Sequence, residues 1–216
     1  MARWAVFDFD GTLLPHTSAE KLFFKRLIRA HIVPPLNLVL FSGMAVWDLL
    51  HNNRYALKAN KYYLRGLPCG ATRRFGSRFF KKEIEPRLSS RGVAEIWQRH
   101  RQGYNILVLS GAPEFLLIPL QQQLPIAYLL GSKPAHHKGR FTGALEAPHP
   151  FAQRKKTYLL ELAPQLDIDF SQSVVFANHH TDALHMELFG EVVAVNPTPR
   201  LYQLAQENHW GIAVWE

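Results

Sequence analysis

The sequence predicts an α/β fold, with a doubly wound and mostly parallel sheet that carries an inserted helical cap. Three observations support this prediction. Short continuous apolar runs recur along the chain, and most are separated by segments long enough for a helix. The block of residues 16–88 contains only helix-like segments, and the excess positive charge of the chain lies almost wholly within it.

The length and composition favour one globular domain or one domain with a small insert. The chain has 216 residues, of which 47% are hydrophobic, so it can bury a full core. One cysteine, Cys69, excludes an internal disulfide framework and fits a reducing compartment. The first residues lack a signal-peptide pattern, and we expect a cytoplasmic protein.

The first apolar run, Trp4–Phe7, ends at Asp8 and is typical of a strand buried on both faces of a parallel sheet. Five similar runs follow it. They are residues 105–109, 126–130, 173–177, 191–195 and 211–215. The segment 136–145 contains Lys138-Gly139 and is expected to form a hairpin or turn after the third core strand.

Helix-like segments fill the block that follows the first strand. They are residues 20–32, 38–50, 55–64 and 72–84, with proline and glycine between them. This arrangement divides the chain into a core, formed by residues 1–15 and 89–216, and a helical cap formed by residues 16–88.

The charge of the chain is divided unevenly. The formal net charge is +8, but residues 16–82 alone hold 13 lysines and arginines against two acids, a net charge of +11. Such a segment suits anionic substrates, a membrane surface or nucleic acid, or it is a solvated helical surface. We expect no specific nucleic-acid binding, because no recognised binding motif is present.

The longest apolar run, residues 36–50, lies inside this basic block. It is interrupted by polar residues and falls short of the ~20 residues needed to span a bilayer. The run could line a greasy pocket or lie at a membrane surface as a peripheral contact. The interpretation we favour from the sequence is a cap-core helix with Met44, Trp47 and Leu50 packed inward.

Two carboxylates, Asp8 and Asp10, follow the first strand in the sequence Asp-Phe-Asp-Gly-Thr. Ligands bind at the carboxyl ends of strands in open α/β sheets, and Gly11 allows a sharp turn just beyond the pair. One carboxylate can attack phosphorus while the other moves protons. The alternative is that the two aspartates are solvated residues of a turn. The specific pattern Asp-x-Asp-Gly-Thr after an apolar run disfavours this alternative.

From this motif onward, the chain resembles the haloacid dehalogenase superfamily, and within it the phosphoserine-phosphatase-like group, subfamily IB. The resemblance covers nearly the whole chain through four ordered motifs, and it implies a HAD-like core with a helical cap inserted after the first strand. It also implies that Asp8 is the nucleophile and Asp10 the general acid and base. The backbone carbonyl of Asp10 would help to bind Mg²⁺.

Ser110 matches the second motif of the family. It ends an apolar run and is followed by Gly111 and Pro113. By resemblance, Ser110 and the N–H of Gly111 bind a phosphate oxygen, and Pro113 opens a helix. An ordinary helix-capping serine would look the same in the sequence.

The third motif requires a cation that offsets the charge of phosphate and nucleophile. Lys155 best fits the family spacing, so the resemblance assigns it this catalytic and phosphate-binding role, with Lys156 as the alternative. Without the resemblance, such a basic cluster is usually a solvated helix face.

The fourth motif departs from the family pattern, because Asn178 stands where relatives usually carry a metal-binding aspartate. Asp182 matches the second aspartate, which supports the lysine and the metal-bound water. An amide oxygen is a neutral ligand, so Mg²⁺ affinity should fall. His179 and His180 are alternative ligands for a transition metal, although Mg²⁺ prefers oxygen. The expected metal site is therefore Asp8, Asp10, Asn178 and Asp182.

The resemblance implies a magnesium-dependent phosphatase that hydrolyses a small phosphomonoester through a phospho-aspartate intermediate. The basic cap favours an anionic substrate, and a phosphorylated lipid would suit both the charge and the apolar run. The alternative is a catalytically weakened protein that binds phosphate ligands or regulates, because of Asn178. A dehalogenase is disfavoured, since Asp10 in the second acidic position favours phosphoryl chemistry in this superfamily.

Overall fold

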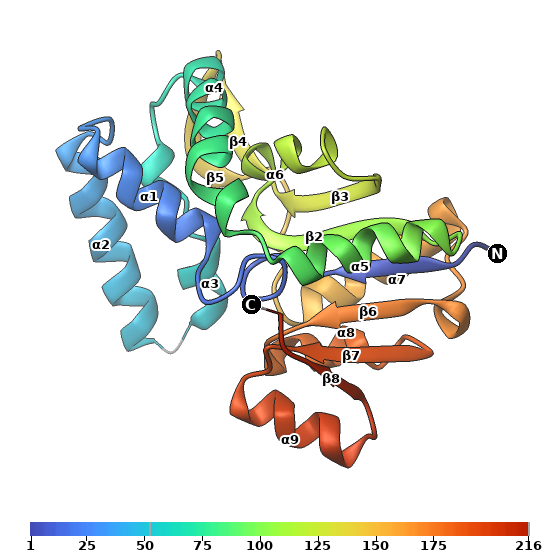
Figure 1. Cartoon of the computed structure of the whole chain (residues 1–216). Helices are drawn as coiled ribbons and strands as arrows, with labels where there is room; N and C mark the ends of the chain where they lie inside the picture. The colour runs from blue at the N-terminus through green and yellow to red at the C-terminus, as the bar shows by residue number, and fades with distance from the viewer. Residues whose placement is uncertain (52, 216) are drawn as a thin grey trace.

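The central feature of the fold is a six-stranded parallel sheet. The computed structural model describes residues 1–51 and 53–215, and in it the strand order is β3-β2-β1-β6-β7-β8 (Figure 1). The strands are β1 (Trp4–Phe7), β2 (Asn105–Pro113), β3 (Ile126–Ser132), β6 (Val174–Ala177), β7 (Glu191–Val195) and β8 (Gly211–Ala213). The α/β fold class expected from the sequence is confirmed, and β1 lies in the middle of the sheet.

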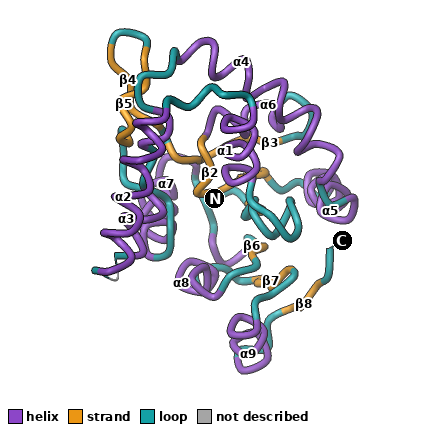
Figure 2. Tube along the Cα trace, turned by 90° about the vertical axis from the view of Figure 1, so that its left-hand side faces the viewer, coloured by secondary structure: helices purple, strands orange, loops and turns teal. Residues whose placement is uncertain are grey.

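Helices cover both faces of this sheet, because successive side chains of each strand point to opposite sides. Ala5 and Phe7 belong to the core cluster under α5 (Ser90–Arg101) and α6 (Glu114–Gln121). Trp4 and Val6 belong to a second cluster under three other helices. These are α7 (Gln153–Leu166), α8 (Ala183–Met186) and α9 (Pro199–Glu207). Figure 2 shows α5 on one side of the strands and α8 and α9 on the other.

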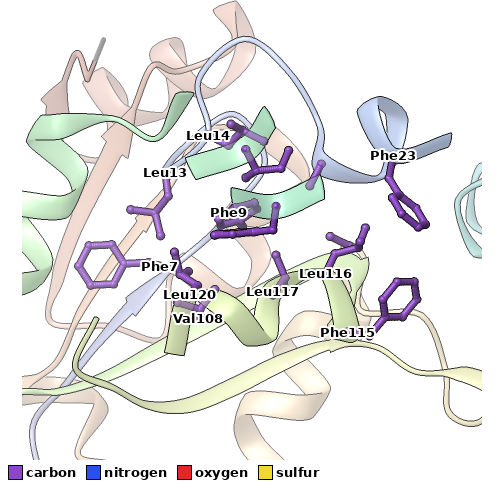
Figure 3. Packing of buried hydrophobic residues seen from close by; sticks show 14 of the residues in the cluster. Phe7, Phe9, Leu13, Leu14, Phe23, Val108, Phe115, Leu116, Leu117 and Leu120 are labelled. Atoms are coloured by element: carbon purple, nitrogen blue, oxygen red, sulfur yellow. The ribbon is translucent and has the colours of Figure 1, made fainter. Parts of the chain in front are cut away.

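Between β1 and α5 the chain forms a block of helices beyond one end of the sheet (Figure 1). Its elements are α1 (Ala19–Arg29), α2 (Pro35–Leu50), α3 (Arg54–Ala59), a 3-10 turn (Tyr62–Leu64), α4 (Cys69–Phe79), a π-helical turn (Phe80–Ile84) and a second 3-10 turn (Glu85–Arg87). Phe23 packs edge to face against Phe115 of α6, with ring centroids 5.7 Å apart. Figure 3 shows Phe9, Leu116 and Leu117 lying between the sheet and these rings, so one apolar core joins the block to the sheet.

A two-stranded hairpin, β4 (Pro134–His137) and β5 (Arg140–Leu145), lies against this helical block. Lys138 and Gly139 both have positive φ, as a tight two-residue hairpin turn requires. The backbone N–H of Gly66 donates to Phe141 at 2.8 Å, and that of Phe141 donates to Leu67 at 3.0 Å. The expected hairpin is confirmed, and it pairs with the inserted block rather than with the six-stranded sheet.

Most sequence-based boundaries differ from the structure by a few residues, and two of the differences have a clear physical cause. The helix expected over residues 55–64 is interrupted at Asn60, whose side chain donates to the carbonyl of Phe41 and accepts from the N–H of Tyr62. These bonds hold Asn60 in an extended conformation that a continuous helix excludes. Strand β2 continues past Ser110 to Pro113, because it keeps pairing with β3 as far as Ser132. Pro113 therefore precedes the first residue of α6 and is not inside the helix.

The expectation that Met44, Trp47 and Leu50 pack inward is wrong. All three are exposed in α2. The helix is apolar on nearly every side, so its sequence pattern does not indicate which face packs against the protein. No helix among the described residues combines the length and the apolar character needed to cross a bilayer.

Candidate active site

Asp8 lies at the carboxyl end of β1, where the backbone of the central strand turns away from the sheet. Its N–H donates to the carbonyl of Phe176 at 2.9 Å, which extends the pairing with β6 by one residue. Its carboxylate is buried and accepts a hydrogen bond from the hydroxyl of Thr12, with 3.3 Å between Oγ1 and Oδ2. The pairing of the parallel strands thus holds the carboxyl group of Asp8 in the interior at this edge of the sheet.

Lys155 is buried in the first turn of α7 and contacts two carboxylates. Its Nζ lies 2.7 Å from Oδ1 of Asp8 and 2.8 Å from Oδ1 of Asp182. Lys156 is half-buried and has no ion pair among the described residues, so the structure distinguishes the two lysines. Asp182 comes from the segment after β6 and completes the cluster of Asp8, Lys155 and Asp182. Its Oδ1 also lies 3.9 Å from Nδ1 of His185.

The charges of this group do not balance, because one ammonium serves two buried carboxylates and Asp10 is close by. Burial raises the pKa of Asp8 to about 7, although Lys155 acts to lower it and Asp182 to raise it. Burial also acts to raise the pKa of Asp182, but Lys155 and His185 bring it below its ordinary value. Burial disfavours the charged form of Lys155, yet Asp182 and Asp8 raise its pKa above the ordinary value. The site therefore holds excess negative charge.

Asp10 faces the start of the helical block. Its Oδ2 accepts from the hydroxyl of Ser18 at 2.8 Å, and its Oδ1 accepts from the N–H of Ala19 at 2.9 Å. The carboxylate thus satisfies a free donor in the first turn of α1. Desolvation raises the pKa of Asp10, while the two hydrogen bonds act to lower it. Asp10 is therefore a carboxyl group that takes up a proton more readily than a solvated aspartate.

Ser110 and Gly111 lie at the carboxyl end of β2, beside Asp8 on the neighbouring strand. Val108 pairs with Phe7, so Ser110 and Asp8 follow the paired residues at the same edge of the sheet. The hydroxyl of Ser110 is buried and accepts from the N–H of Ala112 at 3.1 Å. The structure thus places the expected phosphate-binding serine next to the expected nucleophile.

His149 is a buried residue of this site that the sequence reasoning missed. Its Nδ1 lies 2.7 Å from Oγ of Ser132, and that hydroxyl donates to the carbonyl of Gly111 at 2.6 Å. The other edge of the ring packs against Gly111, where a Cβ would lie 3.2 Å from Nε2. The only signal in the sequence is that Pro148 and Pro150 flank this histidine and restrict its backbone.

The imidazole of His149 is neutral at physiological pH. Burial, followed by the positive charges of Lys61, Lys58 and Lys155, lowers its pKa to about 3. Because the single hydroxyl hydrogen of Ser132 goes to Gly111, the Nδ1–H of His149 donates to Ser132. Its Nε2 then carries no hydrogen and lies close to the backbone of Gly111.

Asn178 follows β6 and lies against Gly11, where a Cβ would come within 2.6 Å of Cγ of Asn178. The amide and Asp10 line the same cavity, which has a volume of about 640 Å³. Lys21 and Lys58 of the helical block also line it, as do the apolar residues Ile212 and Val214. The cavity therefore has basic, acidic and apolar walls.

A hard cation fits the oxygen atoms at this edge, since Asp8, the backbone of Asp10 and Asn178 supply no nitrogen or sulfur ligand and the buried charge is negative. The fit is weak. No three His, Cys, Asp or Glu side chains converge as a metal site anywhere in residues 1–51 and 53–215. A cation would therefore depend on amide and carbonyl oxygens.

His179 and His180 do not form a metal site with a third ligand in the described part of the chain. Nδ1 of His179 lies 2.9 Å from Oγ1 of Thr181 and accepts from the backbone N–H of Thr181 at 3.2 Å. The two rings lie 4.2 Å apart in a half-buried loop. His179 thus caps the short 3-10 turn His180–Asp182, which carries Asp182 toward Lys155.

Comparisons with known proteins identify the family of the chain. The family model described as haloacid dehalogenase-like hydrolase matches residues 5–187. Phosphoserine phosphatase SerB1 of Mycobacterium tuberculosis is 25% identical over 96% of this chain and 69% of its own length. Histidinol-phosphatase of Neisseria meningitidis serogroup C is 23% identical over 98% of both chains.

Solved structures show the same fold. A protein of unknown function from Bordetella pertussis has a TM-score of 0.83 at 18% identity and covers 99% of this chain and 98% of its own. A phospho-aspartyl intermediate analogue of phosphoserine phosphatase has a TM-score of 0.66 at 17% identity and covers 100% and 94%. With the family match spanning most of the chain, and with Asp8, Ser110, Lys155 and Asp182 meeting at one edge of the sheet, this chain belongs to the haloacid dehalogenase-like hydrolases.

Proposed function

We propose that this hydrolase is a magnesium-dependent phosphatase that cleaves a small phosphomonoester through a phospho-aspartate intermediate. The observation that carries the proposal is the buried ion pair between Asp8 and Lys155, which shares its ammonium with Asp182. A buried carboxylate at the carboxyl end of the central strand can reach a substrate and is held in one orientation.

In the first half of the reaction, a carboxylate oxygen of Asp8 attacks phosphorus and forms the aspartyl phosphate bond. The bond between phosphorus and the ester oxygen breaks, and Asp10 gives its proton to that oxygen. The raised pKa of Asp10 supports this role, because it favours a protonated group before attack.

In the second half, Asp10 accepts a proton from a water molecule that attacks the same phosphorus atom. The bond between phosphorus and the Asp8 oxygen breaks, inorganic phosphate leaves, and the Asp8 carboxylate is restored. Asp10 thus serves as acid and then as base, and it ends the cycle protonated as it began.

The phosphoryl group is bound by residues from two strands and one helix. Ser110 and the N–H of Gly111 donate to its oxygens, and Lys155 offsets the negative charge that builds up between phosphate and Asp8. His149 keeps the Gly111 carbonyl in place through Ser132. Bound Mg²⁺ would be held by Asp8, the Asp10 carbonyl and Asn178, with Asp182 behind Lys155, and would supply positive charge for the phosphate oxygens.

The helical block is proposed to be a cap of residues 16–88 on a core of residues 1–15 and 89–216. Tyr55 supports this role, because its hydroxyl accepts a hydrogen bond from the backbone N–H of His149 at 2.7 Å. The substrate is anionic in this proposal, since Lys21 and Lys58 line the cavity beside Asp10. Ile212 and Val214 line the same cavity, and their apolar side chains would also suit a phosphorylated lipid as the substrate. A cytoplasmic location stays a prediction.

A second candidate is a phosphate-binding or regulatory protein with weakened catalysis. The specific observation behind it is Asn178, which leaves the metal site without the carboxylate that relatives usually supply. In this case phosphate still binds at Ser110 and Lys155, but turnover is slow because the charge of the transferring group is poorly offset.

The test is hydrolysis of an aryl phosphate by the wild type, Asp8→Asn and Asn178→Asp across a magnesium titration. Turnover by the wild type that Asp8→Asn abolishes supports the phosphatase. A silent wild type with an active Asn178→Asp supports the phosphate-binding alternative. Full magnesium-dependent turnover by a folded Asp8→Asn contradicts the assigned nucleophile.

A further inference from the structure

Helix α2 presents an apolar face to solvent along its whole length. Its outer stripe consists of Leu36, Val39, Val46, Trp47 and Leu50, which expose between 57% and 76% of their surface. The spacing of three or four residues places them on one side of the helix, together with Gly43. At 1.5 Å per residue the stripe is about 21 Å long. Scattered exposed apolar residues are ordinary, but a continuous stripe of this length indicates an interaction surface.

The opposite side of α2 already has its partners. Asn37 is buried and donates to the carbonyl of Arg65 at 2.6 Å. Phe41 packs against Phe24 and Tyr63, with ring centroids 5.1 and 5.8 Å apart. The inner side of α2 is thus satisfied by polar and apolar partners, while the apolar stripe faces away from the protein, where a surface helix is usually polar. In Figure 1, α2 forms the outer edge of the helical block, on the side away from the sheet.

The helix on which α2 packs, α1, carries exposed positive charges. Lys21, Lys25 and Arg29 are exposed on α1 at a spacing of four residues, and α1 packs on α2 through Phe24 and Phe41. None of the three basic residues has an acidic partner within 4 Å in residues 1–51 and 53–215. The single charged residue of α2, Asp48, is half-buried on the inner side. The exposed face of α2 is therefore apolar and carries no exposed acidic residue, and the neighbouring helix α1 is basic.

We propose that the outer stripe of α2 docks on the surface of an anionic phospholipid bilayer, with α1 supplying the charge contacts. Apolar side chains enter the boundary between headgroups and acyl chains, while lysine and arginine meet the lipid phosphates. The convex surface of a helix can bind to a bilayer because the lipids adapt to its shape, so no matching groove is needed. A second copy of this chain does not fit as well, because it would bring two segments of net charge +11 together.

This docking goes beyond the proposed hydrolysis and does not depend on it. Lys21 belongs both to the basic surface of α1 and to the wall of the cavity beside Asp10. Lys21 thus connects the basic surface of α1 with the wall of the cavity, although no residue of α2 lines that cavity. Binding to vesicles can be measured without any substrate.

The experiment measures binding of the whole chain to vesicles of phosphatidylcholine alone or with an equal part of phosphatidylserine. We expect binding to the anionic vesicles that weakens with added salt. The double variant Val39→Glu, Trp47→Glu should lose it, while the matched core variant Leu160→Glu, Trp97→Glu, also exposed, should bind as the wild type does. Lys25→Glu with Arg29→Glu should weaken binding about thirtyfold or more, since each of the two basic residues near the surface contributes about 1 kcal/mol. Arg101→Glu with Arg200→Glu is the matched charge control.

A second measurement does not depend on loss of binding. An environment-sensitive fluorophore on Val39→Cys should shift to the blue with anionic vesicles, and the same probe on Leu160→Cys should not; Cys69 is buried. The proposal is overturned if the folded wild type ignores anionic vesicles at low salt, or if it binds neutral vesicles equally well. It is also overturned if the Val39→Glu, Trp47→Glu variant binds normally, or if those substitutions only dissociate a dimer formed without lipid.

Discussion

The side-chain amide of Asn178 occupies the space in which a side chain on Gly11 would lie. A Cβ at Gly11 would come within 2.6 Å of Cγ of Asn178, and Gly11 has a φ of +87°. The turn after the paired aspartates is therefore closed by the residue that follows β6. This contact links the first and fourth motifs of the family directly.

Replacing Gly11 by alanine should destabilise the protein by on the order of 1–3 kcal/mol, because it adds a strained backbone and a clash. Thermal unfolding measures the effect. Gly66→Ala is the matched control, since Gly66 has a φ of +77° but no atom within 4 Å of the added Cβ. If the clash with Asn178 matters, Gly11→Ala costs more than Gly66→Ala, and Asn178→Ala recovers part of the difference. Equal losses would show that backbone strain alone is responsible.

Asn178→Asp should tighten magnesium binding, because a charged carboxylate replaces a neutral amide among the candidate ligands. Without magnesium the same change should lower the melting temperature, since it adds a negative charge beside Asp8, whose pKa burial already raises. Calorimetric titration and thermal unfolding with and without magnesium test both effects. An unchanged magnesium dependence would mean that residue 178 is not a ligand.

Lys155→Met should destabilise the protein strongly, on the order of 3–5 kcal/mol, because it leaves buried carboxylates without a partner. Lys156→Met on the same helix should have a small effect, since Lys156 has no ion pair in the described residues. Without Lys155 the pKa values of Asp8 and Asp182 rise, so the folded variant binds protons more readily than the unfolded chain. Its stability deficit should therefore grow as the pH rises and shrink toward pH 4, as melting curves would show.

Asp8→Asn should raise the melting temperature above pH 7 in the absence of magnesium. Burial raises the pKa of Asp8 from an ordinary 3.8 to about 7. Because the folded pKa is raised, Asp8 contributes stability that is full below about pH 4 and is lost as the pH rises through 7. The amide cannot ionise and does not suffer that loss. The gain over wild type should hence be present at pH 8 and absent near pH 4, and a gain that is constant with pH would contradict this account.

His149→Ala should weaken phosphate binding about tenfold, because it removes the donor to Ser132 that holds the carbonyl of Gly111. His149→Asn should retain most of the binding, since its amide N–H lies near the position of Nδ1. His149→Gln is the matched control, as its amide lies near Nε2 instead. Phosphate affinity and its pH profile are the measurements. A transition between pH 5 and 8 in the ring NMR signals of His149, assigned by their loss in His149→Asn, would contradict a neutral ring, whose pKa is about 3.

Most of the sheet could be predicted because its strands are continuous apolar runs. The run Trp4–Phe7 forms β1 as expected, and buried strands of this kind leave little choice of face or length. Boundaries failed where side chains decide the backbone. Asn60 ends α3 through bonds to Phe41 and Tyr62, partners that the sequence does not identify.

The same distinction applies to the candidate site. Asp8 and Lys155 are 147 positions apart, and the motif resemblance paired them where spacing alone could not. His149 carries no motif, and its importance comes from a contact with Gly111 that only folding creates. Apolar residues usually pack inward, which predicts a buried Trp47, but a helix that is apolar on nearly every side does not indicate which face is buried.

The central place of β1 in the sheet has a consequence for how the protein is made. Trp4 pairs with Asn105, and Ala5 pairs with Val174, so β1 leaves the ribosome well before either of the two strands with which it pairs. The contacts among Phe24, Phe41 and Tyr63 form within the intervening block and need no strand. Synthesis therefore favours an order in which the helices of the block pack first and β1 enters the sheet later, when β2 and then β6 have been made.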